Sequence, residues 1–371
     1  MSTSEVLSIP SSSSDSDSSS SQPSTSRMDI RYRSHVLSQR DAELLGPGEL
    51  LNDNLIGFFL DIFTSVLGQD SVYAFSTFFF TQLAQKELAN GWERVKNWTK
   101  NVDIFAHDLL IFPINEANQH WWLIAVIRPR SLIRQVIGYP QTESPPGKLL
   151  ILDSRDCELP EEKKVLSFLH QKAAITVVWY LGKVYLETFG MPEESRLNKK
   201  SINASLKHIA LFPGEHHPKQ DNEYDCGVFL LEFAKRLCAG RENLVRRKEI
   251  TEMFLAEDNG VLAFGQRTVS RRRKALRKLC SSRWMARGGD VEKDLSSAIG
   301  RRIFLESLGK PVEKPQGGFT EGLLAEKRRR ENNEKKREVG KYLAKNLASL
   351  SERKRIKEGA VSKNKMARVR K

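Results

Sequence analysis

One cysteine of this chain stands where a helix is expected to begin, directly after a polar, turn-rich stretch. Cys226 joins residues 218–225 to a nearly continuous apolar run. The apolar residues occupy too many faces for a surface helix, so we expect a buried helix that ends near Lys235, Arg236 and Gly240. The positive end of a helix dipole favours thiolate, the nucleophilic form of cysteine. The alternative, which the helix alone does not exclude, is a small core cysteine.

Three polar residues elsewhere in the chain could complete a site around this thiol. His120 comes directly before an apolar strand expected over residues 121–127, and Asp153 comes directly after another over residues 149–152. A cysteine nucleophile needs a general base, for which histidine is suited, and a carboxylate can orient the imidazole. Gln220 lies six positions before the cysteine, where its amide and the backbone N–H of the cysteine could form an oxyanion hole.

The order of these residues, with the dipeptides HW and DS and the motif Q…DCG, resembles the ubiquitin-like-protein proteases. This adenain-like clan includes the SUMO (sentrin)-specific proteases. Residues 49–63, 94–117 and 246–255 also resemble segments of the family, and the second is most similar to the branch that edits poly-SUMO chains. Each motif is weak alone, but their combined order is specific. The resemblance covers residues 28–256 and implies an α+β catalytic domain with a central mixed sheet flanked by helices.

The resemblance implies a cysteine protease and isopeptidase that cleaves after the C-terminal Gly-Gly of SUMO. Such an enzyme would deconjugate SUMO or trim SUMO chains without a metal or organic cofactor. The catalytic positions of the family fall on His120, Asp153, Gln220 and Cys226. The expected substrate-binding residues are Trp121, Leu50 and Gly227. Leu50 stands where most relatives have a tryptophan, although the chain-editing branch also tends to lack it.

Several alternatives stay open. Asp156 is a second candidate for the orienting carboxylate, but it does not follow a strand. The same mechanism could serve NEDD8 or ubiquitin, because specificity for the modifier lies in a broad surface rather than in a motif. The chain could also be a catalytically weak SUMO-binding module, tethered to nucleic acid by its basic tail. His216 and His217 have no second ligand cluster at metal-binding spacing, so we expect exposed loop histidines there rather than a metal site.

The length and cysteine content limit the class of protein. A chain of 371 residues has room for one domain of ordinary size with appendages. Its four cysteines show neither paired spacing nor a CxxC pattern, which favours a reducing intracellular compartment. The sequence contains no apolar run long enough to cross a bilayer and no signal peptide, so we expect no membrane partner.

The net charge of +14 is concentrated at one end of the chain. Residues 271–371 hold 31 Lys and Arg against 12 Asp and Glu, a net charge of +19, so residues 1–270 carry −5. We expect a disordered serine-rich tail over 1–27, the catalytic domain over 28–256, and a basic tail over 257–371 that is disordered or partly helical. The basic runs fit a nuclear import receptor, nucleic acid or plain solvation, and no aromatic pattern supports sequence-specific nucleic-acid binding. The expected location is the nucleus, with the cytoplasm also open.

The serine-rich tail contains one short apolar patch. Val6, Leu7 and Ile9 precede serines and two aspartates. Motifs that bind SUMO are similar, because an extended apolar segment can add a strand to an open sheet edge while acidic residues meet basic groups. The alternative is chance apolar residues in a disordered tail.

The spacing of apolar residues gives a coarse secondary structure. Helical spacing predicts a helix over 51–62, with Asn52 or Asp53 as its N-cap. The β-branched run over 175–181 predicts a strand, and the polar stretch over 191–205 predicts a loop insertion.

Overall fold

The computed structural model describes residues 29–68, 70–138, 145–155, 168–190, 197–211, 218–246, 261–285 and 289–309. All of these residues belong to one compact unit, Met1–Pro311. The serine-rich tail with its apolar patch at Val6, Leu7 and Ile9 lies outside the described residues, as does the chain from residue 310 onward.

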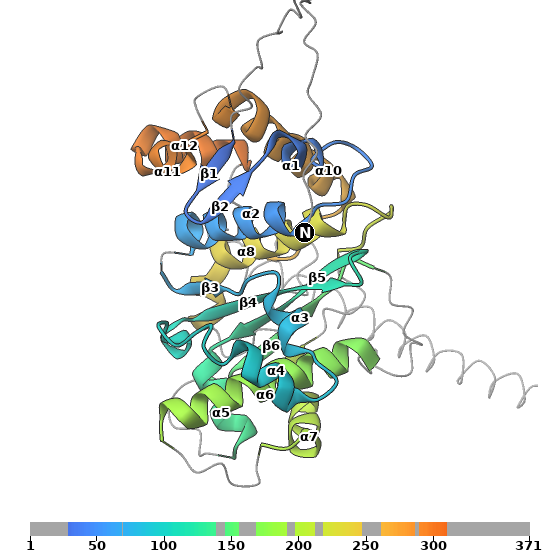
Figure 1. Ribbon diagram of the computed structural model, residues 1–371, viewed down its shortest axis with the longest axis vertical. Coiled ribbons are helices and arrows are strands. Elements are labelled where there is room, and N and C mark those ends of the chain that lie inside the picture. Colours follow the sequence, from blue (N-terminus) through green and yellow to red (C-terminus); the bar gives the residue numbers. More distant parts are fainter. Residues whose placement is uncertain are drawn as a thin grey trace, which may run out of the picture. The chain divides into compact units, whose positions relative to one another are not determined.

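A five-stranded mixed sheet lies at the centre of the described structure (Figure 1). Its order is β3 (Val72–Ala74), β4 (Leu109–Glu116), β5 (His120–Ile127), β6 (Lys148–Leu152) and β7 (Ala210–Leu211). The three central strands are antiparallel, whereas each edge strand pairs in parallel with its neighbour. Helices cover both faces of the sheet, so the predicted α+β fold with a flanked mixed sheet is confirmed.

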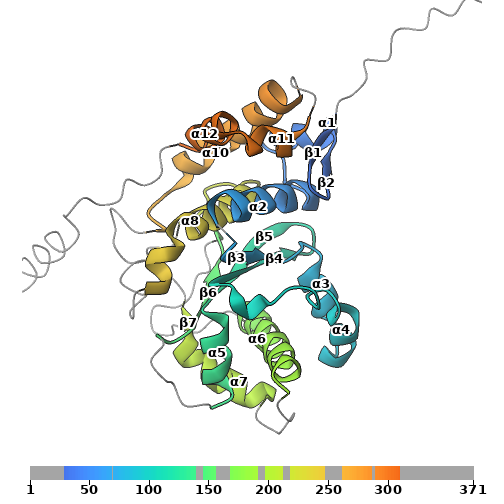
Figure 2. The same cartoon turned by 90° about the vertical axis from the view of Figure 1, so that its left-hand side faces the viewer.

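The two faces of the sheet are buried under different helices (Figure 2). One face carries α2 (Asp53–Leu67) and α8 (Cys226–Arg246). The other core contains α3 (Phe79–Leu83), α4 (Leu88–Val95), α5 (Pro129–Val136), α6 (Phe168–Thr188) and α7 (Lys199–Ile209). Strand residues alternate between the two cores: Trp121 and Leu123 of β5 pack with α2 and α8, while Trp122 and Ile124 pack with α6.

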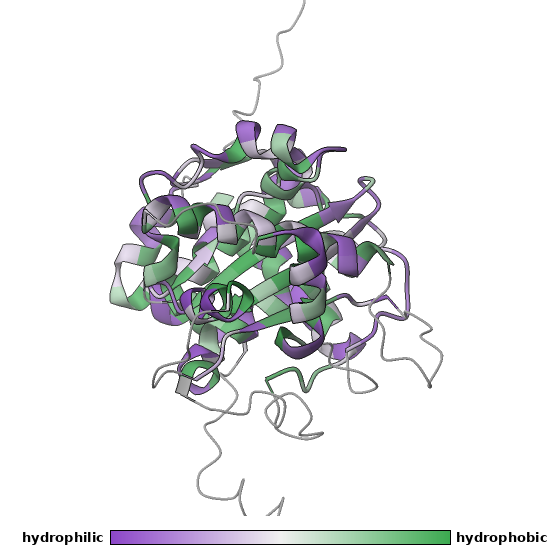
Figure 3. Cartoon of the chain, turned by 90° about the horizontal axis from the view of Figure 1, so that it is seen from below, coloured by the Kyte–Doolittle hydropathy of each residue, from purple (hydrophilic) through white to green (hydrophobic). Residues whose placement is uncertain are grey.

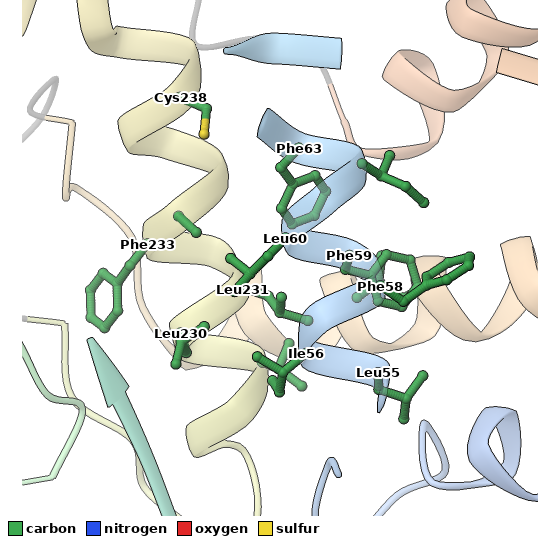
Figure 4. Packing of buried hydrophobic residues seen from close by; sticks show 14 of the residues in the cluster. Leu55, Ile56, Phe58, Phe59, Leu60, Phe63, Leu230, Leu231, Phe233 and Cys238 are labelled. Atoms are coloured by element: carbon green, nitrogen blue, oxygen red, sulfur yellow. The ribbon is translucent and has the colours of Figure 1, made fainter. Parts of the chain in front are cut away.

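Helices α2 and α8 pack against each other above the sheet, as Figure 4 shows. Asn52 caps α2, and its side-chain oxygen accepts from the backbone N–H of Leu55 at 3.0 Å, as predicted. Leu60 and Leu231 point toward each other between the helices (Figure 4). A small α1 (Gln39–Glu43) and the hairpin of β1 (Ile30–Tyr32) and β2 (His35–Leu37) complete this side.

The same core continues beyond residue 256, where the sequence analysis placed a tail. The added elements are α10 (Gln266–Lys278), the π-helical turn η3 (Leu279–Trp284), α11 (Val291–Ser296) and α12 (Ala298–Ser307). Trp284 is 1% exposed and packs against Phe58, Phe59 and Phe304. Composition alone obscures this packing, because the arginines of α10 outnumber its few apolar residues.

Buried ion pairs join α10 to α8. Glu232 on α8 has no exposed surface and accepts from Arg236 at 2.7 Å and from Arg272 of α10 at 2.8 Å. Burial raises the pKa of Glu232, but the surrounding cations lower it by more than burial raises it. The pKa of Glu232 therefore lies below its ordinary value. Part of the basic run SRRRKALRKL therefore stabilises the fold and is not exposed to solvent or to a binding partner.

Three secondary-structure predictions were wrong. Residues 175–181 lie within α6, a 21-residue helix, because burial of a long helix overrides the strand preference of β-branched residues. Residues 199–205 belong to α7, which Asn198 caps by accepting from Ser201 N–H. Helix α8 continues through Gly240 to Arg246, since Lys235 and Arg236 bond to buried partners instead of ending the helix.

Hydropathy follows the layers of the fold. The strands near the centre of Figure 3 are largely hydrophobic, and hydrophilic residues are frequent at the periphery. In the part of the chain that the structure describes, no helix combines the length and apolar character needed to cross a bilayer.

Replacing Trp284 by alanine tests whether the C-terminal helices belong to the folded core. We expect Trp284→Ala to lower the free energy of unfolding by about 3–5 kcal/mol, because it empties a space lined by three aromatic rings. Ile299→Ala is the control; Ile299 is 74% exposed on α12 and should change stability by less than about 0.5 kcal/mol. Urea denaturation measures both, and equal stability of Trp284→Ala and the parent chain would contradict the packing.

Candidate active site

Cys226 is the first residue of α8, and the loop before it is held by its own side chains. Asp225 occupies the N-cap position, since its carbonyl accepts from the Phe229 N–H at 2.9 Å. The Asn222 side-chain oxygen accepts from the N–H groups of Tyr224 and Asp225 at 3.1 and 2.9 Å. These bonds fix the turn that leads into the helix, so the thiol stands at the positive end of the helix dipole. Cys226 itself is fully buried.

The other described cysteines lack such a position. Burial raises the pKa of Cys238 to about 12, and burial likewise raises that of Cys280 to about 12. Both thiols are therefore protonated at neutral pH and serve as small apolar groups. Cys157 lies outside the described residues.

His120 is delivered by the hairpin between β4 and β5. It pairs with Glu116 across the ladder and is the first residue of β5 after the turn. Ala117 and Asn118 in that turn both adopt left-handed conformations, with φ of 53° and 58°. Such turns match the twist of antiparallel strands, so the hairpin fixes the depth at which the imidazole enters the core.

Asp153 follows β6 and lies beside His120, as predicted. Its Oδ1 is 2.6 Å from His120 Nε2 and also accepts from the backbone N–H of Arg155 at 2.9 Å. Asp153 has no exposed surface, and His120 is 5% exposed. A carboxylate can only accept, so Nε2 of His120 carries the proton and Nδ1 is left for the thiol of Cys226. The Cys226 thiol lies close enough to His120 to raise the pKa of the imidazole.

Burial and hydrogen bonding oppose each other at both ionisable groups. Burial lowers the pKa of His120, but hydrogen bonds to Asp153 and Cys226 raise it more, so its net pKa is above the ordinary histidine value. Burial raises the pKa of Asp153, but hydrogen bonds from His120 and His170 outweigh this effect and leave its pKa well below the usual range. Asp153 therefore remains a carboxylate near neutral pH and favours the imidazolium form of His120.

Gln220 is held at three points. Its backbone N–H donates to the carbonyl of Ser154 at 2.8 Å, and its Oε1 accepts from Ser154 Oγ at 2.6 Å. Its Nε2 donates to the carbonyl of Asn222 at 2.5 Å. A carbonyl only accepts, so the orientation of the amide is fixed, and one of its two N–H groups is used by Asn222. The second N–H is the one that could serve an oxyanion.

The residues expected to bind substrate lie around Leu51. The Trp121 side chain is buried, and its Nε1 donates to the Leu51 carbonyl at 2.8 Å. A Cβ atom built on Gly227 would lie 2.9 Å from Leu51 Cβ, so the glycine permits this close approach beside the nucleophile. Leu50 is 41% exposed, as a residue on the wall of a substrate slot would be.

Three further residues support the site and were not predicted from the sequence. His170 bonds to Asp153, and Ser154 holds Gln220. Arg273 of α10 donates to Asp225 at 2.7 Å and to the Tyr224 carbonyl at 2.8 Å. The dipeptide DS contained a signal for Ser154, whereas no site role was predicted for His170 and Arg273 lies in the region that was expected to be a tail.

Some candidates cannot be placed. Asp156, His216 and His217 lie outside the described residues. Within the described ranges, no group of three or more His, Cys, Asp or Glu side chains is arranged to hold a metal ion.

Comparison with known proteins identifies the family. Residues 49–255 match the model of the Ulp1 protease family, C-terminal catalytic domain. The chain belongs to this family. The match covers more than half of the chain and contains His120, Asp153, Gln220 and Cys226.

Curated relatives carry related names. Probable ubiquitin-like-specific protease 2A of Arabidopsis thaliana is 28% identical over 209 residues, covering 53% of this chain and 24% of that protein. Human sentrin-specific protease 5 is 29% identical over 211 residues, which cover 56% of this chain and 22% of that protein. This chain thus spans about a quarter of the length of these relatives. A solved structure of a de-sumoylating protease shares 16% identity with a TM-score of 0.49, over 76% of this chain and 98% of that one.

Replacing Asp153 by asparagine should lower the pKa of His120. The replacement removes the negative charge that raises it and leaves only a neutral amide acceptor, while burial, which lowers it, remains. We expect the NMR titration midpoint of His120 to fall from above the ordinary histidine value to below it. Asp61→Asn, which alters the partner of His35 at 3.1 Å, should leave His120 unchanged. An unaltered midpoint in Asp153→Asn would contradict the assignment.

Proposed function

We propose that the chain is a cysteine protease and isopeptidase that cleaves after the C-terminal Gly-Gly of SUMO, deconjugating SUMO or trimming SUMO chains. The observation that carries the proposal is the buried arrangement in which His120 is hydrogen-bonded to Asp153 and lies beside the Cys226 thiol at the start of α8. This arrangement has the base, the orienting carboxylate and the thiol that nucleophilic catalysis requires. Membership of the Ulp1 protease family supports the choice of a ubiquitin-like modifier.

The proposed reaction has two stages. The Cys226 thiolate attacks the carbonyl carbon of the terminal glycine, and the Gln220 amide with the Cys226 backbone N–H stabilises the oxyanion. The imidazolium of His120 then protonates the leaving lysine amine, which leaves a thioester. In the second stage, neutral His120 takes a proton from water, the water attacks the thioester, and the modifier leaves with a free carboxylate.

The close packing next to the nucleophile suits a substrate end without side chains. Trp121 donates to Leu51, and Leu51 packs against Gly227, the residue directly after Cys226, so glycine residues are the substrate end that would crowd these neighbours least. The relatives named sentrin-specific proteases support SUMO as the first choice of modifier. We assign chain editing on the likeness of residues 94–117 to the chain-editing branch.

The compartment and further partners follow from the charge of the C-terminal region. Residues 271–371 carry a net charge of +19, and within the described residues Arg272 and Arg273 use their charges in ion pairs with the folded core. We propose that the remaining basic runs bind a nuclear import receptor and place the chain in the nucleus. Nucleic-acid binding has no specific motif to support it.

A covalent trap tests the nucleophile and the modifier together. We expect purified chain to form an adduct with SUMO carrying a C-terminal electrophile and to shorten poly-SUMO chains, and Cys226→Ser to do neither. Cys238→Ser is the matched control on the same helix. It should still form the adduct, because it keeps Cys226 and the thiol that it loses is protonated at neutral pH. Adducts with NEDD8 or ubiquitin but not SUMO would overturn the modifier, and no adduct with any modifier would overturn the protease.

Replacing Gln220 by alanine tests the oxyanion hole. We expect kcat to fall by about 10²- to 10³-fold with little change in KM, since the amide would act on the transition state more than on bound substrate. Gln119→Ala, on the exposed hairpin turn, is the control and should retain full activity. Kinetics with a fluorogenic SUMO substrate measure both variants, and a kcat of Gln220→Ala equal to that of the parent would remove the residue from the mechanism.

A further inference from the structure

The catalytic carboxylate is bonded by two histidines, one on each oxygen. Oδ1 of Asp153 is 2.6 Å from His120 Nε2, and Oδ2 is 3.0 Å from Nε2 of His170. Arg155 adds its backbone N–H to Oδ1 at 2.9 Å and places its guanidinium 3.6 Å from Oδ2. The mechanism proposed above uses the imidazole of His120 and leaves the second imidazole without a role.

His170 is fixed in place by the fold. It is the third residue of α6, is 3% exposed, and lies on the face of the sheet opposite α8. Its ring packs edge-on against Trp122, with ring centroids 4.7 Å apart and planes 73° apart. Trp122 is two residues after His120 on β5, so the same strand carries one histidine and the ring that packs against the other.

The chemistry of the contact sets the proton on His170. A carboxylate accepts hydrogen bonds, so His170 must present an Nε2–H to Oδ2. A donor on this oxygen has two effects. It restricts rotation of the carboxylate about its Cβ–Cγ bond, which keeps Oδ1 directed at His120. It also stabilises the charged form of a buried carboxylate that desolvation would otherwise push toward protonation.

We propose that His170 is a positioning residue of the active centre, which acts through Asp153 by holding its carboxylate ionised and correctly rotated for His120. The inference rests on the proposed protease function and extends it by one residue. A merely structural role, in which the same bond only anchors the start of α6 to the sheet, makes different predictions for kinetics and for pH dependence.

Two replacements separate the donor from the packing. His170→Phe keeps a ring against Trp122 and removes the donor. His170→Gln keeps an N–H at a similar reach and removes the ring. We expect kcat on a SUMO substrate to fall roughly 10- to 100-fold in His170→Phe with KM nearly unchanged, because small misplacement of a catalytic group has effects of this size. His170→Gln should recover most of that loss.

The pH profile gives a readout that a structural role would not move. The charged groups around Asp153 are His120 on β5, His170 on α6, Arg155 after β6 and, beyond His120, Cys226 on α8. Loss of the His170 donor disfavours the ionised carboxylate and raises its pKa. The acidic limb of kcat/KM should therefore move to higher pH in His170→Phe and stay near the parental position in His170→Gln.

The outcomes are distinguishable. If the parental chain is active and His170→Phe has the same kcat and pH profile, the role of His170 is overturned and the protease stands. Equal losses of kcat in His170→Phe and His170→Gln would also overturn that role. Inactive parental chain would instead overturn the protease. A measurement independent of activity is the tautomer of His170 from nitrogen-15 NMR of the parental chain. An Nε2–H tautomer is expected, and an Nδ1–H tautomer would overturn the inference.

Discussion

The structure depends on the burial of a helix that has no exposed face along its first three turns. Residues 228–231 of α8 are fully buried, and Leu231 lies between α8 and α2 in Figure 4. Cys226 is the first residue of the same helix. A helix covered on all sides cannot slide or rotate without opening a cavity in a close-packed core. The position of the nucleophile is therefore set by packing along α8, and the bonds of Asn222 and Asp225 only direct the chain into it.

Burial of the nucleophile's partners creates a second constraint. A carboxylate without solvent contact is costly unless each oxygen receives donors. Asp153 receives His120 and a backbone N–H on one oxygen and His170 on the other, so groups from three segments meet at one charge. The end of β6, the start of β5 and the start of α6 are thereby tied together. The same contacts that make burial tolerable also set the protonation of His120.

Much of this arrangement could be predicted from the sequence because the signals are local. Apolar runs bounded by polar residues located β5 and β6, and His120 and Asp153 stand at their ends. The parts of the site that were not predicted depend on contacts between residues far apart in the sequence. His170 lies in a helix whose β-branched residues favoured a strand, and its partner is 17 positions away. Arg273 stands in a basic run, and nothing in that run specifies that two of its arginines are buried in ion pairs.

Arg273 shows why the folded domain needs residues that composition assigns to a tail. Its guanidinium bonds to Asp225 beside the nucleophile, and its Nη1 is 3.0–3.1 Å from the carbonyl oxygens of Leu44, Gly46 and Glu49. The second group leads directly to Leu51, which packs against Gly227 beside the nucleophile. One cation from α10 thus joins the loop before the nucleophile to the loop that shapes its approach. Lysine could not replace it, because a single ammonium group lacks the planar array of donors that reaches both loops.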